Sequence, residues 1–254
     1  MTRKTLGMKS AIAAAALLFM AEAGPSAPID ARIAAAVADP GRPDKDRALD
    51  DARHPAELLA FLHIRPGATV ADIWPGDYWD RLFADVVGPS GTVYAVHLVE
   101  GDKDDKIATP APGSTSLAGH ANVVAAVTHT NTFSLPTKAD VIWIRQNYHD
   151  LYDPFMGPAD VAAFDKAVFA ALKPGGRFVV IDHVAAAGSK LAATNTLHRI
   201  DPAVVKADMA AAGFSFVGES DVLRNPADDH TLKVFDPAIR GHTDQFLLKF
   251  RKPG

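Results

Sequence analysis

The sequence predicts an α/β protein in which a mostly parallel sheet is covered by helices on both faces. Short apolar runs rich in β-branched residues recur along the chain, and segments with helical spacing separate most of them. The runs occupy residues 70–74, 93–98, 122–127, 141–144 and 178–181. Because they are apolar throughout rather than alternating, both faces of each strand should be buried between two layers of helices.

The end of the chain has a different pattern. The segments GFSFVGESDVL and DQFLLKFRKP alternate apolar and polar residues, and a polar connection of about twenty residues joins them. We expect these two segments to form an antiparallel pair that closes one edge of the sheet.

The first residues have the features of an export signal. Arg3, Lys4 and Lys9 precede an apolar run over residues 11–20, and Ala-Glu-Ala at 21–23 fits a small-x-small cleavage site. We expect a signal peptide over residues 1–23, cleavage near Ala23, and a periplasmic or secreted protein. The run is short for a membrane span, so an uncleaved anchor is the weaker alternative and no stable span should remain after cleavage.

Composition excludes several classes of function. Removing residues 1–23 takes away three basic groups and one acid, which changes the formal net charge from −4 to −6 and gives no basic surface for nucleic acid. The chain has no cysteine, so disulfides, thiolate metal sites and cysteine nucleophiles are excluded. The oligomeric state is not indicated.

Between the signal and the first strand, two segments differ in character. Residues 24–43 are rich in Ala, Pro and Gly with little periodicity, which predicts a linker or loosely packed arm. The following residues have helical spacing, and Pro55 should divide them into a polar helix and a second helix that ends before Pro66. A single domain over residues 44–254 is expected.

The order of motifs resembles that of the class I S-adenosylmethionine-dependent methyltransferases over about residues 45–253. The motifs are DIWPGDYW after the first strand, GPSGTVYAV, ADVIWIRQNYHDL, ALKPGGRFVVIDH and the terminal antiparallel pair. The chain is more closely similar to an exported bacterial branch of methyltransferase-like proteins. The resemblance implies a Rossmann-like three-layer sandwich with a seven-stranded sheet and an antiparallel C-terminal strand. It also implies a small-molecule substrate, S-adenosylmethionine as cofactor, and ligands at the carboxyl ends of the strands where the strand order reverses.

The turn after the first strand is where the resemblance places the cofactor. The family pattern acid-x-Gly-x-Gly-x-Gly falls on Asp72, Trp74, Gly76 and Tyr78, so only the acid and the middle glycine match. The family's ribose-binding acid at the end of the second strand falls on His97, and Glu100 lies three residues further on. Asp72, Trp74, Gly76 and His97 are therefore the candidate cofactor ligands.

Aromatic residues gather beside this turn. We expect Trp74 and Tyr78 to line the pocket, where they can stack on a flat ligand, and Trp79 to pack in the core. Arg145 can add a cation–π contact with this group.

Polar residues follow the fourth and fifth strands. Asn147 and His149 are the first candidates for catalytic contacts, because an imidazole titrates near neutral pH and can act as a general base. His183 is a second candidate base, and Tyr78 is the fourth catalytic candidate. The alternatives are that His149 and Asp150 cap the next turn and that His183 is a solvent-exposed loop residue.

Four residues are candidate substrate contacts. They are Arg145, His198, Arg199 and Arg240. Arg199 can grip a carboxylate or phosphate, or it can tie the start of the next helix, capped by Asp201, to a neighbouring acid. Arg240 lies in a connection that could fold over the pocket, or it can pair with Asp244 or Asp51 in a solvated loop.

The residue types also include possible metal ligands. His97, His149, His183 and His198 could gather with Asp72, Asp150 or Asp182 at strand ends. No short spacing such as His-x-x-x-His supports this set, so the sequence predicts no metal.

The functional prediction is a methyltransferase-like enzyme acting on a small molecule, with His149 or His183 removing a proton from the attacking group. Two alternatives remain open. One is an exported lyase or isomerase that uses histidine acid/base chemistry without S-adenosylmethionine, and the other is a periplasmic small-molecule binding protein.

Overall fold

The computed structural model describes residues 30–100, 110–157 and 159–254. The expected signal peptide and residues 24–29 of the expected arm lie outside these ranges. In the part of the chain that is described, no helix is both long and apolar enough to cross a bilayer.

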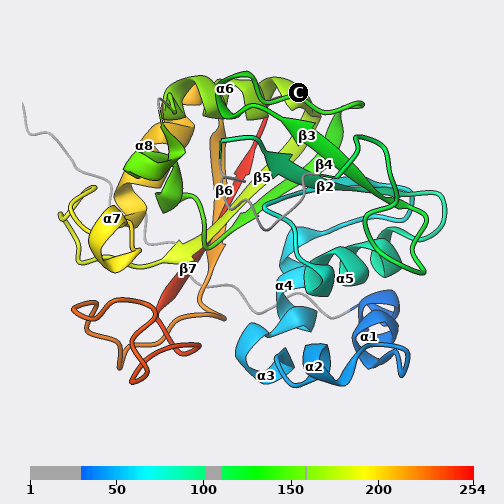
Figure 1. Ribbon diagram of the computed structural model, residues 1–254, viewed down its shortest axis with the longest axis horizontal. Helices are drawn as coiled ribbons and strands as arrows, with labels where there is room; N and C mark the ends of the chain where they lie inside the picture. The colour runs from blue at the N-terminus through cyan, green and yellow to red at the C-terminus, as the bar shows by residue number, and fades with distance from the viewer. Residues whose placement is uncertain (1–29, 101–109, 158) are drawn as a thin grey trace, which may run out of the picture.

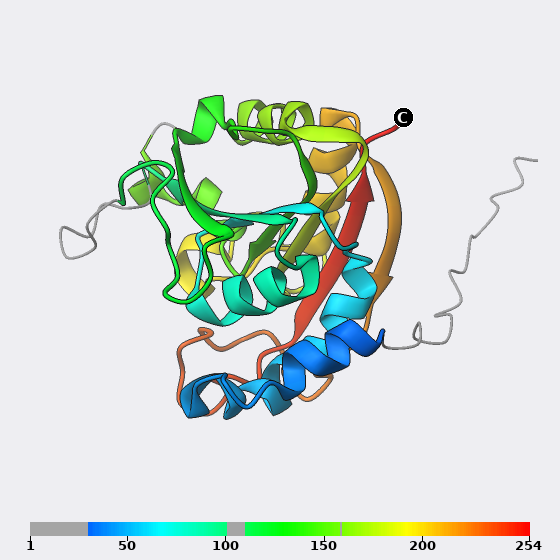
Figure 2. The ribbon, with the colours of Figure 1, turned by 90° about the vertical axis from the view of Figure 1, so that its right-hand side faces the viewer.

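A seven-stranded sheet with the order β3-β2-β1-β4-β5-β7-β6 forms the centre of the molecule (Figure 1). The strands are β1 (Thr69–Ile73), β2 (Thr92–Leu98), β3 (Val123–Thr128), β4 (Ala139–Arg145), β5 (Leu172–His183), β6 (Ser215–Ser220) and β7 (Gln245–Arg251). The first five pair in parallel, whereas β7 runs antiparallel to both β5 and β6. The predicted fold class and the antiparallel terminal pair are confirmed, and Figure 2 shows β6 and β7 side by side at one edge.

The strand order reverses beside β1. This strand pairs with β2 on one side and with β4 on the other, so the chain crosses to opposite sides of β1. In open α/β sheets, the crevice at the carboxyl ends of such neighbouring strands is where ligands bind.

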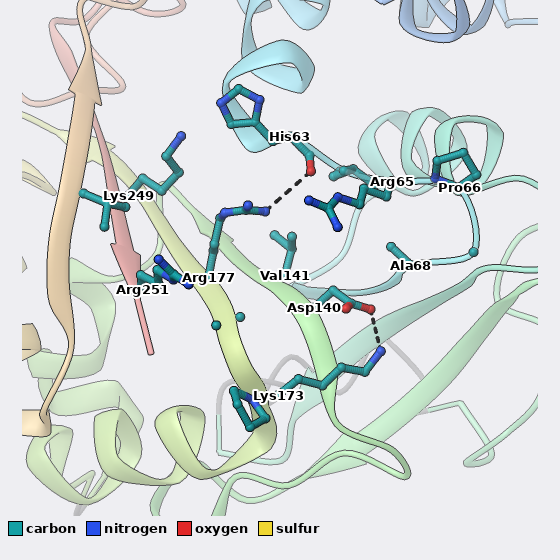
Figure 3. Close-up of a pocket in the computed structure, with 16 residues that line it drawn as sticks. His63, Arg65, Pro66, Ala68, Asp140, Val141, Lys173, Arg177, Lys249 and Arg251 are labelled. Atoms are coloured by element: carbon teal, nitrogen blue, oxygen red, sulfur yellow. Dashed lines mark hydrogen bonds and ion pairs between the residues drawn. The ribbon is translucent and has the colours of Figure 1, made fainter. Parts of the chain in front are cut away.

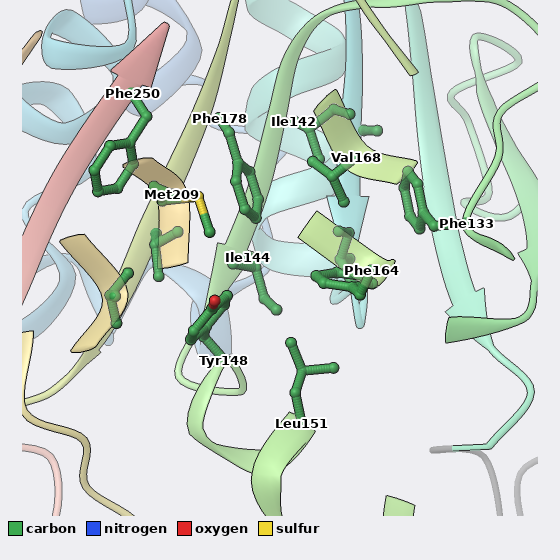
Figure 4. Close-up of a cluster of buried hydrophobic side chains, with 14 of the residues drawn as sticks. Phe133, Ile142, Ile144, Tyr148, Leu151, Phe164, Val168, Phe178, Met209 and Phe250 are labelled. Carbon is green, nitrogen blue, oxygen red and sulfur yellow. The ribbon is translucent and has the colours of Figure 1, made fainter. Parts of the chain in front are cut away.

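Two apolar layers cover the sheet, as predicted. The longer helices are α1 (Ala31–Ala38), α4 (Pro55–Leu62), α5 (Asp77–Val87), α6 (Val161–Ala171) and α8 (Pro202–Ala212). On β4, Ile142 and Ile144 face a cluster that includes Phe164 of α6 and Met209 of α8 (Figure 4). Trp143 faces the opposite cluster with α1, α4 and α5, because successive side chains of a strand point to opposite faces.

The expected loose arm over residues 24–43 is wrong for residues 31–38. Residues 31–38 form α1, which Asp30 caps by accepting a hydrogen bond from the backbone N–H of Arg32. Ile33 and Ala36 are buried against the core. Alanine has the highest helix propensity, so an alanine-rich segment with apolar residues three apart forms a helix once a surface is available for packing.

The segment before β1 breaks at Pro55, as predicted. It contains α2 (Asp44–Arg47), α3 (Asp50–Arg53) and then α4, which has Pro55 in its first turn. Proline is tolerated there because the first backbone N–H groups of a helix have no partner within it. The predicted Asp201 cap of α8 is also confirmed, since its side chain accepts from the N–H of Ala203.

The remaining short elements lie between the strands. They are η1 (Thr130–Thr132), η2 (His149–Tyr152), η3 (Pro154–Met156) and α7 (Thr194–Leu197). Of these, η2 follows β4 directly and α7 follows β5, so both lie at the carboxyl edge of the sheet.

Candidate functional site

A cavity of about 500 Å³ lies at the carboxyl ends of β1 and β4, where the strand order reverses. We call it the switch-point cavity. Its walls come from the turn after β1, the tip of β4 and the helices α2 and α3. They are lined by Lys45, Asp46, Leu49, Arg53, Asp72, Trp74, Gly76, Asp77, Tyr78, Trp79, Trp143, Arg145, Gln146 and Asn147.

The two strand tips share an unusual backbone conformation. Trp74 after β1 has φ 55° and Gln146 after β4 has φ 61°, both in the left-handed region that favours glycine. The N–H of Trp74 donates to the carbonyl of Val96 at 3.0 Å, and that of Gln146 donates to Ile181 at 2.7 Å. Hydrogen bonds to the neighbouring strands β2 and β5 therefore stabilise a left-handed backbone at two positions that lack glycine. Strain of this kind in non-glycine residues is concentrated at functional sites.

Gly76 leaves open space in this turn. It is the N-cap of α5, and a Cβ atom added to it would meet no atom within 4 Å. The remaining glycine of the motif is thus not required by packing. Its lack of a side chain keeps one wall of the switch-point cavity clear.

A buried carboxyl pair lies beneath the turn. Burial raises the pKa of Asp72 well above its usual value, with a further contribution from Asp80. Burial and the charge of Asp77 raise the pKa of Asp80 to about 7. Ionising both carboxylates of a contacting pair is unfavourable because the two negative charges repel. The pair therefore holds a shared proton up to about neutral pH.

Two guanidinium groups enter the cavity without a carboxylate partner within ion-pair distance in the described chain. Burial and the charge of Arg53 lower the pKa of Arg145 to about 10, which leaves it cationic at neutral pH. Arg145 donates from Nη1 to the Gln146 side chain at 2.7 Å, while its buried Nε atom has no hydrogen-bond partner among the described residues. The Arg53 guanidinium lies 4.3 Å from the centre of the Tyr78 ring, and burial lowers its pKa. Half-buried cations in this state favour an anionic ligand.

Tyr78 lines the cavity, as predicted, but its hydroxyl is already used. It donates to Oδ1 of Asp50 at 2.6 Å, and burial together with this contact raises its pKa. Its ring supports Arg53, and the catalytic role expected for Tyr78 stays a prediction. Trp79 packs against Phe83 and Trp143, as predicted, although it also reaches the cavity wall.

The histidines lie beside the cavity rather than in it. His149 Nδ1 is 2.9 Å from Oδ1 of Asp182, and Oδ2 of Asp182 accepts from the His149 backbone N–H at 2.8 Å. Burial lowers the pKa of His149, but the charge of Asp182 and the contacts with Asp150 outweigh it and raise the pKa to about 10. A histidine that is already protonated at neutral pH cannot accept a proton, so the general-base role expected of His149 does not fit this charge state.

His183 has the opposite charge state. Burial, opposed only in part by Asp182, lowers its pKa to about 4, and its Nδ1 lies 2.7 Å from the hydroxyl of Thr243. It is therefore neutral and a weak base at pH 7. Its ring centre is 6.4 Å from that of His149. The expected convergence of His149, His183 and Tyr78 on one hollow beside Gly76 is wrong, because only Tyr78 lines that hollow.

The residues expected to contact the substrate also lie in different places. His198 ends α7 with φ 54° and lies close to His149, with its Nδ1 atom 3.3 Å from Nε2 of that residue. Arg199 is fully buried, and its donors go to Asp228 and to the carbonyls of Val184 and Leu232. Arg199 therefore forms a structural ion pair with Asp228 rather than a substrate contact.

Arg240 is exposed in the connection before β7 and does not line the cavity. The partner expected for it, Asp244, is bound instead by Arg224 at 2.7 Å and by His230 at 2.9 Å. No role for Arg240 in the site follows from this placement.

The position expected to hold a ribose also differs. His97 is half-buried near the end of β2 and is not among the residues that line the switch-point cavity. The carboxylate of Glu100 accepts from the N–H and hydroxyl of Thr130, each at 2.9 Å, and contacts His129 at 2.9 Å. Glu100 is therefore committed to the turn after β3 and does not substitute for the missing acid.

A second large cavity, of about 680 Å³, lies at the opposite edge of the sheet (Figure 3). It is formed at the amino ends of β1, β4 and β5 and has a basic lining that includes Arg65, Lys173, Arg177, Lys249 and Arg251. Although it is larger, it lies far from the strand-order reversal and from the polar strand tips. The switch-point cavity is the better candidate site.

The structure brings two residues to the switch-point cavity that were not among the predicted site residues. Arg53 comes from α3, and Gln146 from the tip of β4. The polar run that contains Arg53 was visible in the sequence, but nothing local to it indicated that α3 folds over the carboxyl edge of the sheet.

Comparison with solved structures shows the fold of S-adenosylmethionine-dependent methyltransferases. The chain is similar to a SAM-dependent methyltransferase from Aquifex aeolicus, with a TM-score of 0.51 and 18% identity over 83% of this chain and 98% of that one. A putative methyltransferase from Bacillus halodurans C-125 gives a TM-score of 0.50 and 17% identity over 78% of this chain and 98% of that one. The [4+2]-cyclase SpnF gives a TM-score of 0.50 and 14% identity over 82% of this chain and 81% of that one.

No family model matches the chain, and no curated protein matches it. The likeness therefore concerns the fold, which hosts more than one kind of reaction.

Proposed function

We propose that this protein is a methyltransferase-like enzyme that transfers a methyl group from S-adenosylmethionine to a small molecule carrying an anionic group. The observation that carries the proposal is the switch-point cavity, which combines the turn after β1 with the cations Arg53 and Arg145. Among the described residues, these cations contact the Tyr78 ring and the Gln146 side chain rather than a carboxylate. Its place in the sheet is the one where this architecture binds ligands.

The turn fits the amino-acid end of the cofactor. The glycine-type backbone at Trp74 and the open space beside Gly76 leave room for a ligand close to the start of α5. The ribose end lacks its usual acid, because Glu100 is bound by Thr130 and His129. When bound, the cofactor supplies an electrophilic methyl group on a sulfonium.

The residues of the chain would mainly bind and orient. Arg53 and Arg145 hold the anionic group, and the aromatic wall formed by Trp74 and Tyr78 packs against the flat part of a ligand. Correct orientation supplies most of the rate in such a transfer. In the metal-free chain, His149 is protonated and His183 is a weak base. The attacking group that suits the site best is therefore one that can attack without a general base, such as a neutral amine or a thiolate.

One observation favours a second candidate function. The bulk of Trp74 and the engagement of Glu100 reduce the match to the usual cofactor, while the cavity and its cations remain. A lyase or isomerase without a methyl donor, or a small-molecule binding protein, would use the same cavity. SpnF, whose fold is similar, is named as a cyclase.

The proposed setting is the periplasm or the outside of the cell, which rests on the basic and apolar pattern of residues 1–23. Mass spectrometry of the protein recovered from the periplasmic fraction tests it. A chain that begins near residue 24 supports export, and an intact Met1 in the cytosolic fraction opposes it.

Calorimetry with S-adenosylmethionine and S-adenosylhomocysteine tests the proposed function. We expect one binding site. Arg53→Met should lower the affinity for a carboxylate-containing ligand by about 10-fold, since charge-assisted hydrogen bonds contribute roughly 1.5–3 kcal/mol. Arg65→Met, which changes an arginine of the cavity at the opposite edge, is the matched control and should bind normally. Absence of heat at millimolar cofactor would reject the methyl-donor proposal and leave the second candidate.

A further inference from the structure

A group of histidines and aspartates lies next to the switch-point cavity. His149, Asp150, Asp153 and His198 each offer one atom, and these atoms all lie within 4.8 Å of one another. We call this group the imidazole–carboxylate cluster. Its members come from η2, from the residue before η3 and from the end of α7, so three short segments at the carboxyl edge of the sheet converge on it.

The distances in the cluster suit a small divalent ion. His149 Nε2 is 3.2 Å from Oδ1 of Asp150 and 3.3 Å from Nδ1 of His198. The third side of this triangle, from His198 Nδ1 to Asp150 Oδ1, is 3.8 Å. A tetrahedral ion with bonds of about 2.1 Å separates its ligand atoms by about 3.4 Å, so small side-chain movements would complete one face of the coordination shell.

Asp153 supplies an independent indication of a missing cation. Asp153 is 2% exposed, and neither of its carboxylate oxygens accepts a well-formed hydrogen bond within the described chain. Burial raises the pKa of Asp153, and the contact with Thr194 and the charge of His149 offset this only in part. Burying a carboxylate without a partner is unfavourable unless a cation compensates for its charge. Asp153 also lines a cavity of about 560 Å³ together with Tyr152 and Asp208.

The surroundings orient the ligand atoms toward the centre of the cluster. Asp182, which is fully buried, contacts Nδ1 of His149 and leaves Nε2 facing the cluster. Asn147 donates to Oδ2 of Asp150 at 2.8 Å and leaves Oδ1 facing His149 and His198. A carboxylate behind a metal-bound imidazole is the usual support of such a ligand.

We propose that the imidazole–carboxylate cluster binds one divalent transition-metal ion through His149 Nε2, His198 Nδ1 and the carboxylates of Asp150 and Asp153. The ion displaces the proton that His149 Nε2 carries in the metal-free chain, so binding should release a proton. Asp182 acts as the orienting partner of His149. Two imidazoles favour zinc, cobalt, iron or manganese over magnesium and calcium, which prefer shells of oxygen alone. The sequence expectation of no metal depended on the absence of a short ligand spacing. The proposed histidines are 49 residues apart in the chain, so such a spacing could not occur.

Zinc binding to the full chain tests the proposal directly. The protein is prepared without a histidine tag, stripped with a chelator and titrated with Zn²⁺ in the absence of S-adenosylmethionine, so that the result is independent of the proposed function. We expect one tight site per chain, and Co²⁺ at the same site should give visible d–d absorption bands.

Variants distinguish this site from surface histidines. His198→Ala and Asp153→Asn should each lower the affinity for zinc by at least about 10-fold. Even the loss of a residue that only supports a metal ligand lowers metal affinity on this scale. His129→Ala removes an exposed imidazole and should bind zinc within about twofold of the parent chain. Equal zinc affinity in the parent, His198→Ala and Asp153→Asn proteins would overturn the proposal, as would the absence of a stoichiometric site.

Thermal unfolding gives a second test, because Asp153→Asn should change the melting temperature in opposite directions without and with zinc. Without metal, Asp153→Asn should raise the melting temperature, because it removes an unpartnered buried charge. With saturating zinc, the parent chain should be the more stable of the two, because it binds the ion more tightly. If zinc raises both melting temperatures equally, Asp153 is not a ligand and the proposed site is wrong.

Discussion

The side-chain amide of Asn147 donates to Oδ2 of Asp150 at 2.8 Å. Asn147 lines the switch-point cavity, and Asp150 belongs to the imidazole–carboxylate cluster. One hydrogen bond between residues of the same turn therefore connects the place where a ligand would bind to the place where an ion would bind. Both sites depend on the conformation of the residues that follow β4.

Gly76→Ala should weaken ligand binding while leaving the fold stable. The added methyl group meets no protein atom within 4 Å, so its cost falls on whatever occupies the cavity. We expect a melting temperature close to that of the parent chain and a loss of at least about 10-fold in affinity for a ligand that contacts the turn. Calorimetry and thermal unfolding measured in parallel check this, and unchanged affinity would place the ligand away from Gly76.

Tyr78→Phe separates positioning from catalysis. Removing the hydroxyl breaks its hydrogen bond to Asp50, which should lower the free energy of unfolding by about 1–2 kcal/mol. Turnover should fall by less than 10-fold, because the ring that supports Arg53 is retained. Urea unfolding and steady-state rates measure the two effects. A rate loss of several hundredfold with normal stability would support the catalytic role expected from the sequence.

Asp80→Asn should change how stability depends on pH. The pKa of Asp80 in the folded protein is raised to about 7, so the folded state holds a proton that the unfolded state has already lost above pH 4. The stability of the parent chain relative to the variant should therefore fall, by up to about 1.4 kcal/mol per pH unit, between pH 4 and 7, and become constant above that. Chemical denaturation at several pH values tests this difference. A flat difference would show that the pair does not hold a proton.

Arg199→Met should strongly destabilise the protein. The guanidinium is fully buried and bonds to Asp228 at 3.0 Å, and its removal leaves a buried carboxylate without its cation. Breaking such a pair typically costs about 3–5 kcal/mol. Arg240→Met is the control, because Arg240 is exposed and its loss should change stability by less than about 0.5 kcal/mol. Similar stabilities of the two variants would contradict the structural assignment of Arg199.

The strands were predictable because a strand that is buried on both faces is apolar throughout, whereas their order in the sheet was not predicted. Runs such as 141–144 are apolar at every position, and the structure places alternate residues in two separate cores. The α1 helix was not predicted, since an alanine-rich segment resembles a linker until the surface that it covers is known. Local patterns identify elements, whereas the packing partner decides whether a weak element forms.

The candidate site was predictable only in part. The predicted residues that line the switch-point cavity all lie at or just after the carboxyl ends of β1 and β4, which meet at the same edge of the sheet. They are Asp72, Trp74, Gly76, Tyr78, Arg145 and Asn147. The charge states of His149 and His183 could not be predicted, because they depend on burial and on Asp182, which lies 33 residues from His149. Asp153 was missed because no spacing links it to His198.

The backbone of Trp74 has a consequence for finding related proteins in genomes. Its left-handed turn is held by a hydrogen bond to Val96 of the adjacent strand rather than by the freedom of a glycine. A search that requires the glycine-rich signature will pass over chains built in this way, even when their ligand-binding edge is intact. Screening for an acid followed two residues later by a left-handed residue bonded to the next strand would recover them.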